Sequence, residues 1–478
     1  MFERASSIGG GVGMSPLAFT DAIDDALAAF SSFVWNWPVA ILLVGGGLFF
    51  MLYARGLPLR FLPHALSILR GRYDDPSDPG QVSHFRALSS ALAATVGMGN
   101  ISGVALAIGM GGPGALFWMW VSAFVGMATK FFTCTLAILY RGKDETGEVQ
   151  GGPMYFIVEG LGPRARPLAI FFSIAGLIGS LAVVQSNQLT QILRDEVFTP
   201  SGWFVESPMV GDAMVGVVVM VLVSLVIFGG ITRIAAVAAR LVPGMVVLYL
   251  GAALVILGSN VAEIPGLLGM VLQDAFTAEA AQGGALGSMI ILGIRRAAFS
   301  NEAGIGTEAL AHGAAKTREP VREGLVAMLG PLVDTLIVCN ATALVILSTG
   351  VWETSADSGV TLTTQAFETA LPGVGRPLLI LAVVCFAFST MLGYSYYGCK
   401  CAAFLFGVRA RMPYNVFYVV TLGGACLMSI DAVFDLIDGV FALMAIPTMT
   451  ATLLLSPHVM RAARDYFRRL KAGEFPKR

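Results

Sequence analysis

Long apolar stretches alternate with short polar ones along the whole chain. A helix needs about twenty mostly apolar residues to cross the hydrocarbon core of a bilayer, and about eleven stretches reach that length. The pattern therefore predicts an all-α integral membrane protein with about eleven transmembrane helices. The predicted spans are residues 37–53, 85–108, 115–140, 167–188, 213–231, 241–258, 287–311, 324–347, 377–397, 414–430 and 432–455.

The polar stretches between these spans alternate in charge. Odd-numbered gaps and the C-terminal tail are basic, whereas even-numbered gaps are acidic or neutral. Because cytoplasmic loops carry an excess of Lys and Arg, the alternation predicts an external N-terminus and a cytoplasmic C-terminus in the inner (plasma) membrane. The basic gaps contain for example Arg55, Arg141, Arg233, Lys316 and Arg411, and the acidic gaps Asp195, Glu263, Glu353 and Asp431.

The composition agrees with a membrane location. Of the 478 residues, 56% are hydrophobic and 13% are charged, with a mean hydropathy of +0.76, whereas soluble domains carry roughly 25% charged residues. The formal net charge of −1 says nothing about partners, and no basic run suggests nucleic acid, so we expect no nucleic-acid partner. The cysteines lack metal-ligand spacing, which predicts free thiols and no cofactor.

The second predicted span contains an interruption at residues 95–103, where the sequence reads TVGMGNISG. Each glycine lowers helix propensity by roughly 1 kcal/mol relative to alanine. Inside a bilayer, backbone leaves the helix only where it is buried in protein or lines a polar cavity. A break here would free N–H and C=O groups to hold an ion and a small polar solute. The alternative is that Gly99 and Gly103 form a Gly-x-x-x-Gly packing face between ordinary helices.

The seventh predicted span carries a second candidate break at residues 297–307. Two arginines, an asparagine and a glutamate near its middle are costly in lipid, so they should face protein or water. Ser300, Asn301 and Glu302 resemble a helix N-terminus, with a capping side chain followed by an acid near the positive end of the helix. The alternative is two short segments joined by a buried salt bridge between Arg296 and Glu302.

Each interrupted span opens a run of five spans, and the odd separation inserts the two runs upside down relative to each other. Broken helices at matching positions of inverted halves predict a transporter with its site at the bilayer midplane. This architecture resembles the leucine-transporter (LeuT) type, a 5+5 inverted repeat, here preceded by one extra helix. The expected parts are an N-terminal segment with the first helix and a basic cytoplasmic loop (1–84), a first repeat (85–258), an external loop (259–284), a second repeat (285–456) and a basic cytoplasmic tail (457–478).

Five motifs carry a family resemblance. They are GMGNISGVA at 97–105, GGPGALFWMW at 111–120, GGPMY at 151–155, FSNEAGIG at 299–306 and LGYSYYG at 392–398. Together they resemble the alanine or glycine:cation symporter family, over nearly the whole chain from about residue 88 to 407. The resemblance implies sodium-coupled uptake of small neutral amino acids, with the substrate held between the two broken helices.

A few positions depart from the pattern of that family. Met98 stands where a small Ser or Thr is usual, and Tyr394 replaces a usual Trp. Thr133 and Cys399 occupy places where a Glu is common. Because Met98 and Tyr394 lie near the expected pocket, they bear on the identity of the substrate more than on the fold or the coupling.

An amino-acid zwitterion needs compensation at both ends when it leaves water. N–H groups at residues 97–100 and a half-helix N-terminus favour its carboxylate, and carbonyls near Phe299 and Ser300 suit its ammonium group. Gln185 resembles a family position that faces the substrate, and its alternative role is a hydrogen bond between helices. Phe299 and Tyr394 would close around a small side chain. The expected substrate-binding residues are Gly97, Met98, Gly99, Asn100, Gln185, Phe299, Ser300, Asn301, Thr390 and Tyr394.

Ser389 and Thr390 place two hydroxyl oxygens in an otherwise apolar span. Hard cations take oxygen ligands, and hydroxyls with unwound carbonyls supply them without a fixed charge. The alternative is that both hydroxyls bond back to their own helix. With the family pattern, the expected sodium ligands are Thr95, Val96, Met98, Ser389 and Thr390.

Other functional classes fit the sequence less well. A membrane enzyme would show a cluster of His and acidic residues, and the four histidines lie near the ends of spans without an acid at ligand spacing. A channel needs no paired broken helices. Proton coupling through Glu302 or Asp334 is the main alternative to sodium. The expected partners are a small amino acid, sodium and lipid, with a monomer as the default state.

Overall fold

The computed structural model describes residues 16–276, 285–355 and 358–475, which are almost entirely helical. The N-terminal part holds α1 (Pro16–Val34), α2 (Trp37–Ala40), the π-helical turn η1 (Ile41–Gly45), α3 (Gly46–Tyr53), α4 (Leu57–Arg60) and α5 (Leu62–Leu69). Next come α6 (His84–Thr95), η2 (Gly99–Gly103), α7 (Val104–Gly111), α8 (Gly114–Leu139), α9 (Pro153–Leu161), η3 (Pro163–Ala165), α10 (Arg166–Gly179), α11 (Val183–Leu193), η4 (Arg194–Phe198), α12 (Pro208–Ile227), α13 (Gly230–Ser259) and α14 (Ile264–Asp274).

The C-terminal part begins beyond the segment 277–284. It consists of α16 (Ala285–Asn301), α17 (Thr307–His312), α18 (Pro320–Ala327), α19 (Leu329–Pro331), η5 (Leu332–Cys339), α20 (Asn340–Thr349), α21 (Val351–Thr354), α22 (Val360–Ala370), α23 (Gly375–Phe406), η6 (Val408–Ala410), α24 (Arg411–Ala425) and α25 (Ile430–Lys471). Within the described residues, strands occur as one antiparallel pair, β1 (Gly142–Lys143) and β2 (Val149–Gln150).

Seven helices of the described residues are long and apolar enough to cross a membrane, and nine if each of two bent pairs is one span. One bent pair joins α1 to α2 and α3, and the other joins α6 to η2 and α7. Two further predicted spans coincide with α16 plus α17, which are separated by residues 302–306, and with α24, which has 15 residues. The multi-span prediction is confirmed, whereas the number eleven stays a prediction.

Several helix boundaries differ from the predicted ones. The predicted span 167–188 is interrupted at residues 180–182, between α10 and α11. The helix predicted at 241–258 begins already at Gly230, and the helix predicted at 432–455 continues to Lys471. Hydropathy marks where a helix enters the hydrocarbon layer, but hydrogen bonding continues into polar residues on either side, so the predicted ends were too short.

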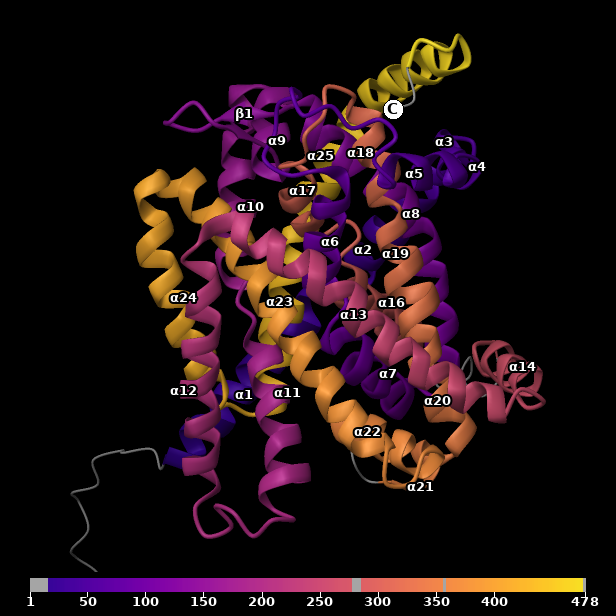
Figure 1. Ribbon diagram of the computed structural model, residues 1–478, viewed down its shortest axis with the longest axis vertical. Helices are drawn as coiled ribbons and strands as arrows, with labels where there is room; N and C mark the ends of the chain where they lie inside the picture. Colours follow the sequence, from indigo (N-terminus) through magenta and orange to yellow (C-terminus); the bar gives the residue numbers. More distant parts are fainter. Residues whose placement is uncertain (1–15, 277–284, 356–357, 476–478) are drawn as a thin grey trace, which may run out of the picture.

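Polar segments gather at two opposite ends of the helical body (Figure 1). The end that carries the C-terminus, named here the C-terminal face, holds α4, α5, β1, α9 and the start of α18. The opposite end holds α14, α21, α22 and the N-terminal part of α1. This separation matches the alternation of basic and acidic gaps along the chain. The side of the membrane that each face contacts stays a prediction.

Helices that contain the two predicted breaks occupy the centre of the body. The helix α8 packs against both α16 and α18, and α23 packs against both α6 and α13. Side chains in these contacts are mostly buried, including every residue from Ala87 to Val104. The break regions are therefore surrounded by protein rather than by lipid, as irregular backbone at membrane depth requires.

Candidate functional site

The first break lies between α6 and η2. Val96 leaves the helix with φ −72° and ψ 95°, and the two parts of the span meet at a bend of 54°. The Gly97 amide donates a hydrogen bond of 2.7 Å to the Asn100 side-chain oxygen. The predicted interruption is confirmed, but the Gly97 N–H is already satisfied within the chain. The N–H groups of Met98 and Gly99 stand at the start of the new helix, where no intrahelical acceptor precedes them.

The glycines of this break also permit a close approach between helices. A Cβ atom at Gly99 would lie 3.0 Å from the Ser300 Cα atom and 3.2 Å from Phe299 Cδ1. A Cβ atom at Gly103 would meet Phe299 Cδ1 at an ordinary 3.8 Å. The packing role offered as the alternative for Gly99 is therefore real, and it coexists with the break. Gly99 is therefore one of the points where the two interrupted spans touch.

The second break occupies residues 302–306, because α16 continues through Asn301 and α17 begins at Thr307. The expectation that Ser300, Asn301 and Glu302 start a helix is wrong. Glu302 has φ 57°, and Gly304 and Gly306 have φ 87° and 101°, a left-handed backbone that cannot continue an α-helix. The carbonyls of Phe299 and Ser300 belong to the last turn of α16, where intrahelical donors are missing.

The arginines before this break pair with α25 and not with Glu302. Arg295 donates to Asp435 at 2.7 Å and to Asp438 at 2.6 Å, and Arg296 also donates to Asp438. The alternative of a buried Arg296–Glu302 salt bridge is therefore wrong. Two acidic residues 140 to 143 positions away supply the partners, which a local reading of the sequence cannot foresee.

Two buried carboxylates lie at the start of the short helix α17, Glu302 before it and Glu308 within its first turn. The Tyr394 hydroxyl on α23 donates to Glu302 at 2.6 Å, and the Thr307 hydroxyl donates to the other oxygen of Glu302. The Thr133 hydroxyl on α8 donates to Glu308 at 2.8 Å. Both departures from the family pattern therefore act as donors to a buried acid. A glutamate at position 133 would instead face the Glu308 carboxylate.

A buried hydrogen-bond network joins the two breaks. The Asn100 side-chain amide donates to Asp334 Oδ1 at 2.8 Å, to Ser300 Oγ at 3.2 Å and to Cys339 Sγ at 3.2 Å. The Ser300 hydroxyl donates to Asp334 Oδ2 at 2.6 Å, and the Thr335 hydroxyl donates to the same oxygen at 2.8 Å. All five side chains are fully buried. Sequence-predicted residues Asn100 and Ser300 thus meet at a carboxylate on η5.

Asp334 is the main residue of this network that was not predicted from the sequence as a binding residue. It was named only as an alternative proton carrier. Its signal in the sequence is a single carboxylate inside the apolar stretch 324–347, which is costly in a membrane without partners. The buried Lys130 on α8 acts electrostatically on both Asp334 and Glu302. Asn301 also contacts the η5 segment, because its side-chain amide donates to the Thr335 hydroxyl at 2.9 Å.

The hydroxyls of α23 lie against the first break. No space exists for a Cβ atom at Gly97, because the Thr390 hydroxyl oxygen occupies its place. The hydroxyls of Ser389 and Thr390 donate to the Phe386 carbonyl at 2.9 and 3.1 Å. Both hydroxyl hydrogens therefore bond back to their own helix, as the alternative expected. Each oxygen keeps lone pairs that remain available to a cation.

The other predicted site residues are buried at or near the same region. Met98 and Val96 are fully buried, and the Thr95 hydroxyl donates to its own helix at 3.1 Å. Phe299 packs on an aromatic ring of α25, with 5.3 Å between ring centroids. The side-chain oxygen of Gln185 is buried, and no residue of the described chain hydrogen-bonds to it. A partner helix therefore does not satisfy this oxygen.

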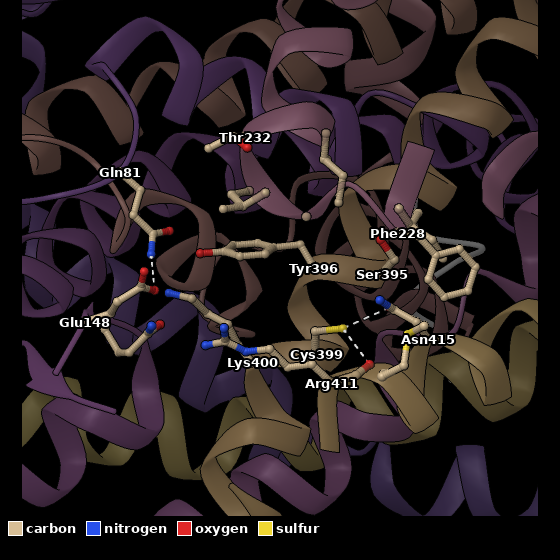
Figure 2. Close-up of a pocket in the computed structure, with 16 residues that line it drawn as sticks. Gln81, Glu148, Phe228, Thr232, Ser395, Tyr396, Cys399, Lys400, Arg411 and Asn415 are labelled. Carbon is tan, nitrogen blue, oxygen red and sulfur yellow. Dashed lines mark hydrogen bonds between the residues drawn. The ribbon is translucent and has the colours of Figure 1, made fainter. Parts of the chain in front are cut away.

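A cavity of about 450 Å³ opens at the C-terminal face, near the departure Cys399 (Figure 2). Tyr396, Lys400 and Arg411 are among the residues that line this cavity. The Lys400 ammonium donates to the carbonyls of Gly151 and Leu310 at 3.0 and 3.2 Å, which ties α23 to the segments before α9 and in α17. Cys399 donates to an asparagine of α24 at 2.9 Å.

Interrupted helices that meet at a buried, oxygen-rich centre define a transporter. A model of the sodium:alanine symporter family matches residues 20–478, and the chain belongs to this family. The family identifies the chain as a transporter and not an enzyme, and its name implies sodium as the coupling ion. The resemblance seen in the motifs of the sequence is therefore confirmed.

Relatives and a solved structure support the same assignment. The sodium/alanine symporter AgcS of Methanococcus maripaludis is 38% identical over 91% of this chain and 95% of its own length. The probable sodium/glutamine symporter GlnT of Bacillus subtilis is 34% identical over 93% and 90%. The crystal structure of MhsT in complex with L-phenylalanine matches with a TM-score of 0.56 at 15% identity, covering 79% of this chain and 89% of that one. This likeness supports a LeuT-like fold.

Proposed function

We propose that this protein carries small neutral amino acids, alanine and glycine, into the cell together with sodium by alternating access. The observation that supports this most directly is the meeting of both helix breaks at Asn100, Ser300 and Asp334, with Thr390 against the first break. An ion and a zwitterion need this kind of buried polar backbone and oxygen lining when they leave water. The names of AgcS and GlnT refer to alanine and glutamine, which supports an amino acid as the substrate class.

In this proposal, residues 85–258 and 285–456 are two inverted five-helix halves, and the site lies between them. Residues 1–84 precede the halves, and the segment 259–284 connects them on the external side. The likeness to MhsT and the position of each break at the start of its half support this division. Of the connecting segment, residues 277–284 lie outside the described part of the chain.

The proposed substrate contacts follow the polarity of the two breaks. N–H groups at the start of η2 would hold the carboxylate, and the carbonyls ending α16 would hold the ammonium group. Gln185 offers a buried side-chain oxygen without a protein partner among the described residues. Phe299 and Tyr394 would border the substrate side chain, with Met98 and Asn301 beside them. The proposed sodium ligands remain Ser389 and Thr390 with carbonyls near residues 95–98.

Uptake into proteoliposomes tests the coupling ion. We expect labelled alanine to accumulate when sodium is high outside and to equilibrate without accumulation when potassium replaces sodium at the same pH. Unlabelled glycine should compete with it. A pH gradient without sodium should give no accumulation. Accumulation that persists without sodium and follows the pH gradient would overturn the sodium assignment.

Proton coupling is the second candidate because two carboxylates, Glu302 and Asp334, are fully buried beside the second break. Glu302 accepts hydrogen bonds from the hydroxyls of Tyr394 and Thr307, and Asp334 accepts from hydroxyls and from the Asn100 amide. A protonated carboxyl could satisfy the same partners. The gradient experiment separates the two candidates, because only a proton symporter accumulates substrate on a pH difference alone.

The orientation in the membrane is tested by cysteine accessibility in intact cells. We expect an impermeant maleimide to label Ser355→Cys from outside, and Arg318→Cys only after permeabilisation. The Arg318 side chain is 70% exposed, so access to it depends on the membrane and not on the fold. The basic gaps predict this result through the excess of Lys and Arg on cytoplasmic loops. Labelling in the reverse pattern would contradict the proposed orientation.

A further inference from the structure

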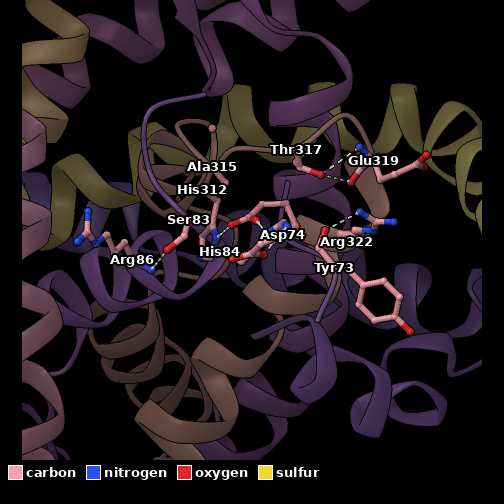
Figure 3. Close-up of polar contacts among 12 residues, drawn as sticks. Tyr73, Asp74, Ser83, His84, Arg86, His312, Ala315, Thr317, Glu319 and Arg322 are labelled. Carbon is pink, nitrogen blue, oxygen red and sulfur yellow. Dashed lines mark hydrogen bonds and ion pairs between the residues drawn. The ribbon is translucent and has the colours of Figure 1, made fainter. Parts of the chain in front are cut away.

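A buried carboxylate lies between two imidazole rings near the C-terminal face (Figure 3). The Nδ1 atom of His312 is 2.5 Å from one oxygen of Glu323, and the Nδ1 atom of His84 contacts the other oxygen. Glu323 is fully buried, and both histidines are 1% exposed. In Figure 3, His84, His312 and Asp74 converge on one point, whereas Arg86 is directed away from it.

This cluster connects the ends of both broken spans. His84 is the first residue of α6, His312 is the last residue of α17, and Glu323 lies on α18. Backbone hydrogen bonds join the same segments: the amides of Gln81 and Val82 donate to the Ala314 carbonyl at 2.8 and 3.2 Å. We name residues 79–84 and 312–317 together with Arg141 and Glu323 the latch.

Arg141 fastens the latch from the end of α8. Its guanidinium donates to the carbonyls of Pro79, Gly313 and Thr317 at 3.1 to 3.2 Å, and to that of Ala315. Burial lowers the pKa of Arg141 to about 10, so the side chain stays charged at neutral pH. Arg141 is therefore a fixed cation bound to the backbone of the latch, and the charge of the buried centre depends on the cluster around Glu323.

The geometry identifies where a further proton belongs. An ionised Glu323 accepts from both rings, so each histidine carries a hydrogen on Nδ1. The Nε2 atom of His84 has no hydrogen-bond partner in the described chain and lies 4.0 Å from the Asp74 carboxylate. In a neutral ring this atom would present a lone pair to a negative oxygen. In an imidazolium it presents an N–H with positive charge, which both carboxylates favour.

Other charged groups around α18 have partners of their own. Glu319 pairs with Arg469 at 2.7 Å, and Arg322 donates to a backbone carbonyl at 3.1 Å while stacking on aromatic rings. The neighbouring elements carry Lys130 and Cys134 on α8, Glu308 on α17, His64 on α5 and Tyr466 on α25, and Arg86 of α6 is exposed and directed away from the cluster. A protonated His84 with Arg141 then balances the charges of Glu323 and Asp74.

We propose that the His84–Glu323–His312 cluster is a proton-binding site that holds the latch closed. Its role as a gate rests on the proposed function, in which the C-terminal face is the cytoplasmic exit for substrate. Release of substrate there requires the ends of the two broken spans to separate. When they separate, water reaches the cluster and the bound proton can leave to the cytoplasm.

The sign of the pH effect follows from this arrangement. The closed latch binds the proton more tightly than the open one, so the closed state is favoured at low pH. Loss of the proton as pH rises leaves the buried Glu323 carboxylate and the partly exposed Asp74 carboxylate without the imidazolium between them, which destabilises the closed state. We therefore infer that cytoplasmic acid holds the exit shut and that alkaline conditions favour its opening.

Cysteine reactivity in the purified full-length protein tests the latch without any substrate or sodium. Thr317→Cys is nearly isosteric, and Thr317 is 1% exposed, so a maleimide reaches it only when the latch opens. Its labelling rate is divided by that of the exposed Arg318→Cys, which removes the pH dependence of the thiol itself. We expect this ratio to rise about fivefold or more between about pH 6 and about pH 8.5, the range in which histidine titrates.

Variants inside and outside the cluster distinguish a pH response of the cluster from a general effect of pH on the protein. In Thr317→Cys with Glu323→Gln the ratio should change less than about twofold over the same pH range. With His84→Gln labelling should be fast at both pH values. The control Glu319→Gln removes a carboxylate that directly precedes α18 and lies outside the cluster, and it should keep the full response.

A ratio that is independent of pH in the protein with an intact cluster would overturn the proposal, whatever the folding of the variants. An unchanged response in a folded Glu323→Gln protein would overturn it as well. Neither result depends on transport activity. A failure of sodium-driven uptake would contradict the proposed function and leave the labelling result standing as a test of the proton site.

Discussion

Gly99→Leu protein is expected to bind neither alanine nor glycine, although it inserts into the membrane and purifies as a folded monodisperse protein. A Cβ atom at this position would already lie 3.0 Å from the Ser300 backbone, and a larger side chain would force the two breaks apart. Overpacking of a tight contact costs typically 1–3 kcal/mol. The same displacement would remove the backbone N–H groups that the proposal assigns to the substrate carboxylate. Equilibrium binding of labelled alanine measures the effect.

Graded substitutions in the same segment separate this effect from general instability. Gly99→Ala should weaken binding by about tenfold, which corresponds to about 1.4 kcal/mol. Gly103→Ala is the matched control, because its Cβ atom would meet Phe299 Cδ1 at an ordinary 3.8 Å. The control should bind within about twofold of the unmodified protein, or within about 0.4 kcal/mol. Unchanged affinity in Gly99→Leu would place the pocket elsewhere.

The position of the first break could be predicted because its causes are local. Gly97, Gly99 and Asn100 lower helix propensity within a few residues, and the Asn100 side chain caps the Gly97 amide of the same turn. The alternation of basic and acidic gaps is local as well, and it matches the two polar faces of the structure. Such features need no knowledge of which helices become neighbours.

The second break was predicted in the right span but with the wrong local structure. Ser300 and Asn301 have the composition of an N-cap, yet their side chains bond to Asp334 and Thr335 across to η5. The Asn301 side-chain oxygen does accept from the Ala303 N–H at 3.0 Å, as a cap would, but the residues that follow do not continue as a helix. Glu302 then takes a left-handed conformation that ends α16.

Contacts between distant segments explain the other differences. Arg295 pairs with Asp435 and Asp438, which the sequence places in the final span, and no periodicity links the two regions. Asp334 stood out as an intramembrane carboxylate, but the three hydrogen-bond donors to it, Asn100, Ser300 and Thr335, come from three segments of the chain. One sequence without its fold leaves such pairings undetermined, whereas it identifies the residues that need partners.

Coupling requires that the ion and the substrate bind together. Entry of one sodium ion down an inside-negative potential of about 100 mV yields roughly 2.3 kcal/mol. This corresponds to about a fiftyfold gradient of amino acid, because about 1.4 kcal/mol is tenfold. If the ion entered alone, this energy would be lost as a leak. An ion site that touches both α23 and the first break would link sodium occupancy to the state of the broken helix.

The double variant Ser389→Ala with Thr390→Ala is expected to need about 100-fold more sodium for half-maximal uptake. Contacts to a charged group contribute roughly 1.5–3 kcal/mol each, so loss of two oxygens costs about 3 kcal/mol, while the methyl groups keep most of the packing. The structure places the Thr390 oxygen where a side chain at Gly97 would be, within the segment 95–98 proposed to supply the carbonyl ligands. Substrate affinity should fall in parallel at low sodium and recover at high sodium. Uptake into proteoliposomes over a sodium series, at constant ionic strength, measures both quantities.

Ser395→Ala provides the control for the loss of a hydroxyl from the same helix. Ser395 also bonds back to its own helix, at 2.7 Å to the Leu392 carbonyl, but it lies toward the C-terminal face beside the cavity there. Its removal should leave the sodium dependence within about twofold, or about 0.4 kcal/mol. If the double variant retained the sodium dependence of the unmodified protein at equal amounts of folded protein, Ser389 and Thr390 would serve only their own helix. The ion would then have to bind elsewhere, with the oxygens around Asp334 as the next place to examine.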